Sequence, residues 1–199
     1  GSGKTKVITH RIAYLLSEKA CSPENILAVT FTNKAAGEMR LRLTDLLNGK
    51  IYLPWLGTFH GICVKILRLE GYKIGLNPQF TIYDGNDSTD LIKKCMSELE
   101  LDPKRYSHGA IKAFISGAKN ELMDPIEYRK FANGPFVEKV CDLYQIYQQK
   151  LQESDALDFD DLIMKTVILF KNNDEIAQKY QKQFKYIHID EYQDTNTAQ

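Results

Sequence analysis

The residues GSGKT at positions 1–5 match the end of the phosphate-binding pattern G-x-x-x-x-G-K-[ST]. In that pattern a glycine-rich loop points its backbone N–H groups at phosphate oxygens, and the helix that follows adds its positive N-terminal end. The lysine reaches the β- and γ-phosphates, and the hydroxyl binds Mg²⁺. The first glycine of the pattern would precede Gly1, so we expect the chain to begin inside the motif. The residues predicted to bind phosphate are Gly1, Ser2, Gly3, Lys4 and Thr5.

The composition predicts a globular, soluble protein. Of the 199 residues, 43% are hydrophobic, which is enough for a sizeable core. Charged residues interrupt the apolar runs well before the roughly 20 residues that a membrane span needs, and no secretory signal is visible, so we expect a cytoplasmic location. The four cysteines lie far apart without a C-x-x-C pair, which favours buried thiols over a metal site or a disulfide framework.

The net charge is zero, but the charges are unevenly distributed along the chain. Residues 1–80 hold 11 Lys and Arg against 5 Asp and Glu, whereas residues 81–155 hold 10 against 13 and residues 156–199 hold 5 against 8. A surplus of basic residues in the first segment permits an electropositive face for a polyanion, although charged helix faces are commonly just solvated surface.

Helical and strand patterns alternate in the first 80 residues. Helical spacing runs from Thr5 to Lys19, and a short apolar run from Ile26 to Phe31 has the length of a buried parallel strand. A helix is predicted from 34 to 47, a second strand from Trp55 to Phe59, and a further helix from 61 to 69. This alternation predicts an α/β fold with a parallel sheet.

The pattern changes at about Thr81, where a turn and N-cap cluster precedes a series of helices without a strong strand run. The predicted helices are 88–100, 108–121, 125–132 and 135–153. After Ala156 the α/β pattern resumes, with helices near 159–171 and 174–183 and a last strand from Tyr186 to Asp190. We therefore predict a helical domain at 81–155, inserted into an α/β domain formed by 1–80 and 156–199.

Two adjacent carboxylates, Asp190 and Glu191, follow the last predicted strand. Enzymes with a phosphate-binding loop place such residues at a strand end, with the Asp on Mg²⁺ and a neighbouring acid near the attacking water. The pair therefore completes a constellation that GKT begins.

Four further segments carry a family resemblance. Asp190–Asn196 (DEYQDTN) resembles motif II of the superfamily 1 DNA helicases of the UvrD/Rep/PcrA type, and Thr30–Ala36 (TFTNKAA) resembles their motif Ia. Gly57–Gly61 (GTFHG) resembles their next single-strand-binding motif, and Leu157–Leu162 (LDFDDL) their DFxDL segment. With GKT these motifs occur in the family's order and span the whole chain.

The resemblance implies a RecA-like P-loop domain, called 1A, that is interrupted by an all-helical insertion, 1B. In this family ATP binds between domain 1A and a second RecA-like domain, and the protein moves 3′ to 5′ along single-stranded DNA and unwinds duplexes. The implied roles are phosphate binding by Lys4, Mg²⁺ binding by Thr5 and Asp190, water orientation by Glu191 and γ-phosphate sensing by Gln193.

The resemblance also implies a DNA-binding edge, which the residue types support. Single strands are held by aromatic faces that stack on bases and by polar groups on phosphates. Such residues follow two predicted parallel strands, whose carboxyl ends meet at one sheet edge. The candidates are Phe31, Thr32, Asn33, Thr58, Phe59 and His60.

Two further segments leave alternatives open. In the predicted insertion, Ile115–Glu121 resembles a family segment near duplex DNA, so Lys112, Lys119 and Asn120 are either backbone contacts or part of a solvated helix face. The stretch Asp158–Leu162 is either on the DNA side or simply an acidic helix start.

The leading hypothesis is the 1A/1B part of an ATP-dependent 3′ to 5′ DNA helicase of repair or replication restart. Because the second RecA-like domain and its arginines are absent from residues 1–199, we expect this chain alone to hydrolyse ATP negligibly. The motor of a recombination helicase–nuclease is an alternative, as is a non-catalytic module that binds single-stranded DNA. A small-molecule kinase fits least, because it would not account for the QDTN and TFTNKAA segments.

Overall fold

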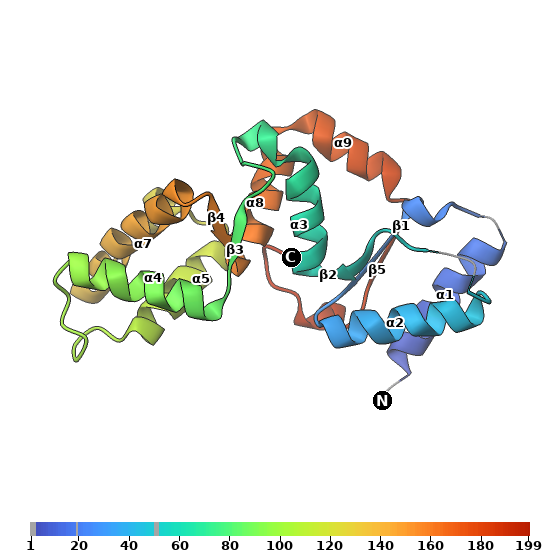
Figure 1. The fold of residues 1–199 in the computed structure, drawn as a ribbon, viewed down its shortest axis with the longest axis horizontal. Helices are drawn as coiled ribbons and strands as arrows, with labels where there is room; N and C mark the ends of the chain where they lie inside the picture. The colour runs from blue at the N-terminus through green and yellow to red at the C-terminus, as the bar shows by residue number, and fades with distance from the viewer. Residues whose placement is uncertain (1–2, 19, 50–51) are drawn as a thin grey trace. The chain divides into compact units, whose positions relative to one another are not determined.

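The computed structural model describes residues 3–18, 20–49 and 52–199. The chain forms two compact units, shown in Figure 1. The sheet unit consists of Gly1–Ile66 and Leu169–Thr195, and the helical unit consists of Leu67–Ile168 and Asn196–Gln199. Helices α3 (Phe59–Glu70) and α8 (Phe159–Asn172) each include a boundary between the two units.

The sheet unit is built on a three-stranded parallel sheet with the order β2-β1-β5. Its strands are β1 (Ile26–Thr30), β2 (Leu56–Thr58) and β5 (Tyr186–Ile189). The register places Thr30 beside Thr58 and Val29 beside Ile189. All three strands therefore end at the same edge, and the segments that follow them emerge there.

Helices α1 (Lys4–Ser17) and α2 (Asn33–Leu46) pack with strands β1 and β2 around one core (Figure 1). Its fully or nearly fully buried side chains include Ile12, Leu16, Met39 and Leu43, which recur at helical spacing on the two helices. The short helix η1 (Pro23–Asn25) leads into β1, and α9 (Asp174–Gln183) precedes β5.

Local capping defines where these helices begin. Gly3 is the N-cap of α1 and has a φ of 73°, a left-handed conformation that glycine adopts without steric cost. At α2 the hydroxyl of Thr32 accepts a hydrogen bond of 3.1 Å from the backbone N–H of Ala35. Each helix thus starts directly at a segment that the sequence assigns to ligand binding.

The only tryptophan in the sequence, Trp55, joins β2 to its surroundings. Its carbonyl oxygen accepts a hydrogen bond of 2.9 Å from Ala28, and its buried ring makes edge contacts with Tyr180 and Phe184. The ammonium of Lys65 lies 4.0 Å from the ring centroid, which adds a cation–π interaction. These contacts fix the strand directly before Thr58.

The helical unit contains most of the remaining elements. Its four complete helices are α4 (Gly85–Glu98), α5 (His108–Asn120), α6 (Pro125–Arg129) and α7 (Pro135–Glu153). A buried cluster that includes Ile92, Ile111, Leu143 and Tyr144 holds α4, α5 and α7 together. The short helix η2 (Gly71–Ile74) also belongs here, and η3 (Tyr192–Asp194) belongs to the sheet unit.

The predicted α/β class with a parallel sheet is confirmed, and so are the predicted strands and helices to within a few residues. One feature was missed: β3 (Thr81–Tyr83) and β4 (Ala156–Asp158) form a separate parallel pair. With three residues each, these strands are too short to show periodicity. The helical unit is therefore not all-helical. Its bounds, Leu67–Ile168 together with Asn196–Gln199, are also wider than the predicted 81–155.

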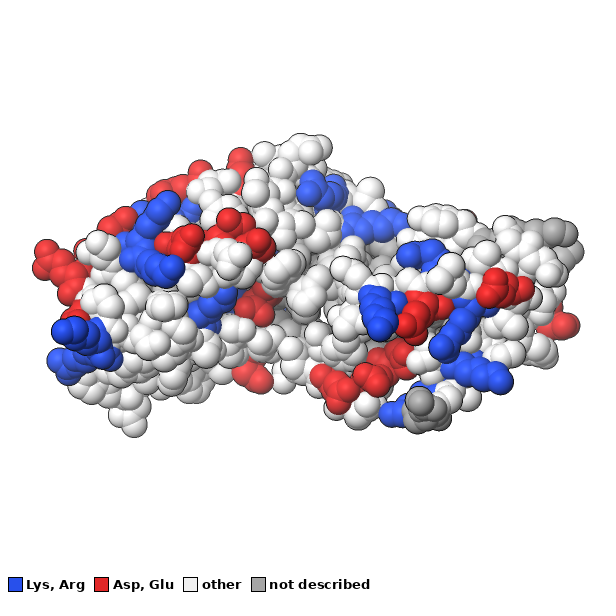
Figure 2. Space-filling model, turned by 60° about the horizontal axis from the view of Figure 1, so that its bottom comes forward, with Lys and Arg blue, Asp and Glu red and all other residues white. Residues whose placement is uncertain are grey.

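The described residues include no helix long and apolar enough to cross a bilayer. Of the four cysteines, Cys63, Cys95 and Cys141 are buried and Cys21 is half-buried. On the face shown in Figure 2, basic and acidic side chains are interspersed, so a basic surplus in the sequence does not produce a patch of one sign on that face.

Candidate functional site

The predicted phosphate and metal residues meet at the end of β5. The hydroxyl of Thr5, in the first turn of α1, donates a hydrogen bond of 2.8 Å to Oδ2 of Asp190. The backbone N–H of Asp190 donates to the carbonyl of Val29 at 3.0 Å, which continues the pairing of β5 with β1 by one residue. The sheet therefore places this carboxylate opposite the start of α1.

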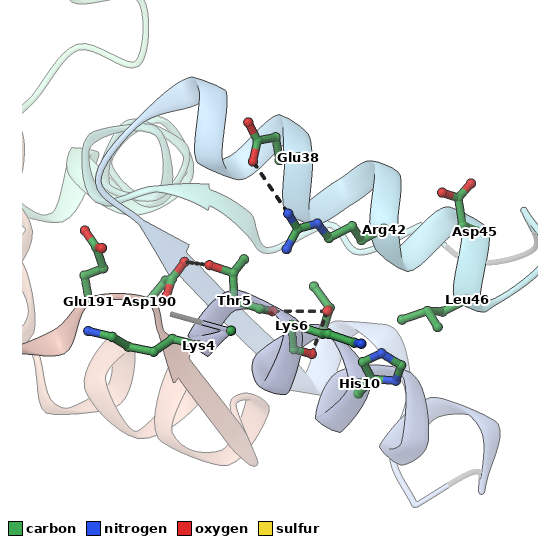
Figure 3. Close-up of a pocket in the computed structure, with 12 residues that line it drawn as sticks. Lys4, Thr5, Lys6, His10, Glu38, Arg42, Asp45, Leu46, Asp190 and Glu191 are labelled. Atoms are coloured by element: carbon green, nitrogen blue, oxygen red, sulfur yellow. Dashed lines mark hydrogen bonds and ion pairs between the residues drawn. The ribbon is translucent and has the colours of Figure 1, made fainter. Parts of the chain in front are cut away.

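A cavity of about 730 Å³ opens beside this hydrogen bond. Figure 3 shows Lys4 and Thr5 from α1 together with Asp190 and Glu191, and helix α2 on the other side. Five of the predicted residues line the cavity, namely Gly3, Lys4, Thr5, Asp190 and Glu191. Gly1 and Ser2, which the sequence also assigns to this site, lie outside the described residues.

The structure places Gln193 apart from the residues that line the cavity. It lies in η3, and its exposed side chain donates to Oδ2 of Asp194 at 3.3 Å. Glu191 precedes this turn and has a φ of 55°, a left-handed conformation that is uncommon for a residue with a Cβ. The chain therefore turns sharply directly after Asp190.

The residues fit a magnesium ion. Asp190 is buried, and its Oδ1 atom has no hydrogen-bond partner in the part of the chain described here. A buried carboxylate oxygen without a partner is costly, and a cation would satisfy it. Magnesium in nucleotide sites takes one or two protein oxygens plus substrate phosphates, and the Asp190 carboxylate and Thr5 hydroxyl are such oxygens. Within the described ranges no cluster of three or more His, Cys, Asp or Glu side chains offers an all-protein metal site.

Helix α2 contributes a wall that sequence analysis missed. The lining residues outside the predicted set are Lys6, Thr9 and His10 of α1 and Glu38, Arg42, Asp45 and Leu46 of α2. Arg42 forms an ion pair of 3.9 Å with Glu38, and both side chains are about half exposed. The spacing of these α2 residues by three and four is the one signal in the sequence that puts them on a common face.

The predicted DNA-binding residues come together at the ends of β1 and β2. The rings of Phe31 and Phe59 are half-buried, and their centroids lie 5.4 Å apart. The Thr58 hydroxyl accepts a hydrogen bond of 3.1 Å from Gly61, as Thr32 does from Ala35. Asn33 is exposed and His60 is half-buried. The structure thus gathers all six candidates at one edge of the sheet.

The helical unit contains a buried ion cluster. The side chain of Lys119 is 0% exposed, and its Nζ lies 2.7 Å from Asp158 and 2.9 Å from Asp161. Tyr147 donates to Asp158 at 2.8 Å, and Gln148 donates to Asp161. Burial by itself would raise the pKa of the Asp158 carboxyl, but Lys119 and the hydrogen bonds outweigh burial and lower it.

The cluster corrects the expectation for Lys119, which was wrong, because a fully buried ammonium cannot contact a DNA backbone. Lys112 donates to the carbonyl of Gly85 at 2.7 Å and to Thr89 at 3.0 Å, so this ammonium is also engaged within the protein. Asp158 and Asp161 of the DFDDL segment are likewise engaged within the protein, whereas Phe159 between them is 46% exposed.

Comparison with known proteins agrees with the motifs. A family model described as UvrD/REP helicase N-terminal domain matches residues 1–199. The ATP-dependent DNA helicase PcrA of Bacillus subtilis (strain 168) is 51% identical over 199 residues, which are 100% of this chain and 27% of that protein. Proteins of the same name from Staphylococcus epidermidis (strain ATCC 12228 / FDA PCI 1200) and Staphylococcus aureus (strain NCTC 8325 / PS 47) are 49% and 47% identical with the same coverage.

Proposed function

Because this chain belongs to the UvrD/REP helicase N-terminal domain family, we propose that it forms the part of an ATP-dependent DNA helicase that binds Mg²⁺–ATP and single-stranded DNA. The chain spans 27% of the length of the relatives, so unwinding is proposed for the protein that carries this chain. We propose 3′ to 5′ movement, a single strand next to a duplex as the DNA partner, and a second RecA-like domain of the same protein as the other wall of the ATP site.

One observation carries this proposal. Asp190 accepts a hydrogen bond from Thr5, its buried Oδ1 has no partner among the residues that the structure describes, and both residues line a cavity together with Lys4. A hydroxyl, a carboxylate and a lysine at the start of a helix are the groups that a nucleoside triphosphate with Mg²⁺ requires.

The roles of the residues follow from their chemistry. The Lys4 ammonium binds the β- and γ-phosphates, and the backbone at Gly3 lets them approach the start of α1. Thr5 and Asp190 would hold Mg²⁺, which neutralises charge on the phosphates when bound. Glu191, which is exposed at the cavity, orients the attacking water, and Gln193 responds to the γ-phosphate. At the other site, Phe31 and Phe59 stack on bases while Thr32, Asn33, Thr58 and His60 contact the strand.

Nucleotide binding tests the proposal directly. The chain is titrated with a fluorescent ATP analogue with and without Mg²⁺. The same titration is made with Lys4→Ala and, as a matched control, with Lys94→Ala at an exposed position of the helical unit. We expect Mg²⁺-dependent binding that weakens at least about tenfold in Lys4→Ala and not in the control, because a charge-assisted phosphate contact contributes about 1.5–3 kcal/mol. Equal binding by the two variants would contradict the proposal.

Catalysis is tested separately. We expect residues 1–199 alone to hydrolyse ATP negligibly, because the arginines that complete such a site belong to a second domain. The protein that carries this chain should hydrolyse ATP faster with single-stranded DNA and separate duplexes, and Lys4→Ala should abolish both activities. ATP hydrolysis by residues 1–199 at the rate of that longer protein would contradict the expectation that a second domain completes the site.

A further inference from the structure

The C-terminal end of α5 is unusually well anchored. Lys119 is locked into the buried cluster with Asp158 and Asp161, as described above. Four residues later the carbonyl of Met123 accepts a hydrogen bond of 3.0 Å from the buried Tyr144 of α7. The backbone between these two residues is therefore held at both ends, and it carries the side chains of Asn120 and Glu121.

Those two side chains contact the last residue of motif II and the residue after it. Asn196 donates from Nδ2 to Oδ1 of Asn120 at 2.7 Å, and Thr197 donates to Oε1 of Glu121 at 3.3 Å. Asn196 is also bonded reciprocally with Gln199, since its Oδ1 accepts from the N–H of Gln199 and its N–H donates to the Gln199 side chain. This pair has the form of a capping box, so the tethered segment is itself ordered.

Only a short hydrogen-bonded turn connects Asn196 to the proposed catalytic residues Glu191 and Gln193. Asp194 donates its N–H to the carbonyl of Glu191 at 2.9 Å, and the hydroxyl of Thr195 donates to the carbonyl of Tyr192 at 2.8 Å. Between Glu191 and Asn196 the chain is thus folded into a turn by its own hydrogen bonds. A displacement of Asn196 would therefore change the backbone conformation of that turn.

We propose that Asn120 is a positioning residue for motif II: by holding Asn196 it restrains the turn that carries Glu191 and Gln193. The inference rests on the proposed function, because it assumes that these two residues orient water and respond to the γ-phosphate. Asn120 contacts no nucleotide itself. It acts through one side-chain hydrogen bond, and the buried Lys119 beside it keeps its backbone in place.

The experiment compares three variants in the protein that carries this chain. Asn120→Ala removes the acceptor for Asn196, Asn120→Asp keeps an acceptor oxygen, and Ser116→Ala removes only the other contact of Asn120, a 3.4 Å hydrogen bond. For Asn120→Ala we expect a three- to tenfold lower kcat for DNA-stimulated ATP hydrolysis with an unchanged KM for ATP. Asn120→Asp and Ser116→Ala should retain the kcat of the parent protein.

A second measurement on the same proteins is amide hydrogen exchange across 192–199. In Asn120→Ala we expect several-fold faster exchange there, while exchange in α1 and β1 and the thermal midpoint stay unchanged. Unaltered exchange and kcat in Asn120→Ala would overturn the positioning role while leaving the proposed function intact. A parent protein that hydrolyses no ATP with DNA would instead overturn the proposed function, and this inference with it.

Discussion

Thr5 and Asp190 are 185 residues apart in sequence and joined by a hydrogen bond of 2.8 Å. One lies at the start of α1 and the other just beyond β5, so tertiary packing and not local sequence brings them together. The bond occupies Oδ2 of the carboxylate, and the buried Oδ1 has no partner in residues 3–18, 20–49 and 52–199. The Asp190 carboxylate thus keeps one negatively charged oxygen available to a cation at the proposed metal site.

Removing this charge should raise the thermal stability of the protein and remove the Mg²⁺ dependence of nucleotide binding. In Asp190→Asn we expect the thermal midpoint to rise by about 2–4 °C, because the amide oxygen still accepts the hydrogen bond from Thr5 and the buried negative charge is removed, a gain of about 1 kcal/mol. We also expect nucleotide binding to lose its dependence on Mg²⁺. Differential scanning calorimetry measures the first effect and titration with a fluorescent nucleotide the second. Asp194→Asn, at an exposed carboxylate, serves as the control and should change neither; a lower midpoint in Asp190→Asn would refute this prediction.

The buried ion cluster makes a contrasting prediction about stability. Lys119→Met leaves two buried carboxylates without their cation, so the free energy of unfolding should fall by about 3–5 kcal/mol. Lys93→Met removes an exposed ion pair with Asp90 within helix α4, and this should cost less than about 1 kcal/mol. Urea unfolding measures both. Adding Asp161→Asn to Lys119→Met should recover part of the loss, and similar losses in the two single variants would speak against the cluster.

The buried thiol of Cys95 predicts a pH dependence at alkaline pH. Burial raises the pKa of Cys95 from 9.0 to about 11 and outweighs the nearby Lys150, which lowers it. Because the folded-state pKa is the higher one, this contribution to stability is complete below pH 9 and is lost as the pH rises toward 11. Urea unfolding at pH 8, 9, 10 and 11 should therefore show a steeper decline for the parent than for Cys95→Ala. The slope of the unfolding free energy against pH tests the pKa of Cys95. A pH-independent difference between the parent and Cys95→Ala reports the cavity that the substitution leaves. Parallel slopes would show that the thiol does not titrate as described.

The aromatic pair at the sheet edge predicts the strength of DNA binding. Phe31→Leu keeps an apolar side chain but removes the ring beside Phe59, so affinity for a single-stranded oligonucleotide should fall about 5- to 100-fold. The salt dependence of binding should persist, because phosphate contacts are retained. Fluorescence anisotropy across a salt series measures both. Phe114→Leu, at a 42% exposed ring of the helical unit, is the matched control, and equal losses in the two variants would argue against stacking at this edge.

The sequence predicted the sheet unit well because its signals are local and mutually consistent. A mostly buried apolar run marks β1, a short run of residues typical of strands marks β5, and cap residues such as Gly3 and Thr32 mark the helix starts. It could not predict the pairing of β3 with β4, because three residues provide no periodicity and the partners are joined only by tertiary contacts.

Side-chain roles were harder to predict than elements. Lys119 was taken for a surface cation, yet Ile111, Ile115 and Ala118 place an apolar stripe on the same helix and Lys119 lies at its margin. The carboxylates of Asp158 and Asp161, which are far away in sequence, offset the cost of burying its charge, and no local sequence pattern reveals such partners. The α2 wall of the cavity escaped notice for a similar reason, since its charged residues become a lining only when α1 packs beside them.

Trp55 gives the protein a built-in optical reporter. As the sole indole in the chain it can be excited selectively over the tyrosines, and its emission colour and intensity depend on the Lys65 ammonium above the ring and the aromatic edges around it. It lies three residues before Thr58, at the strand whose end carries the proposed DNA-binding edge. Spectral shifts of a single unlabelled fluorophore can therefore be read as the response of that strand to nucleotide and to DNA, in real time and without attaching a dye.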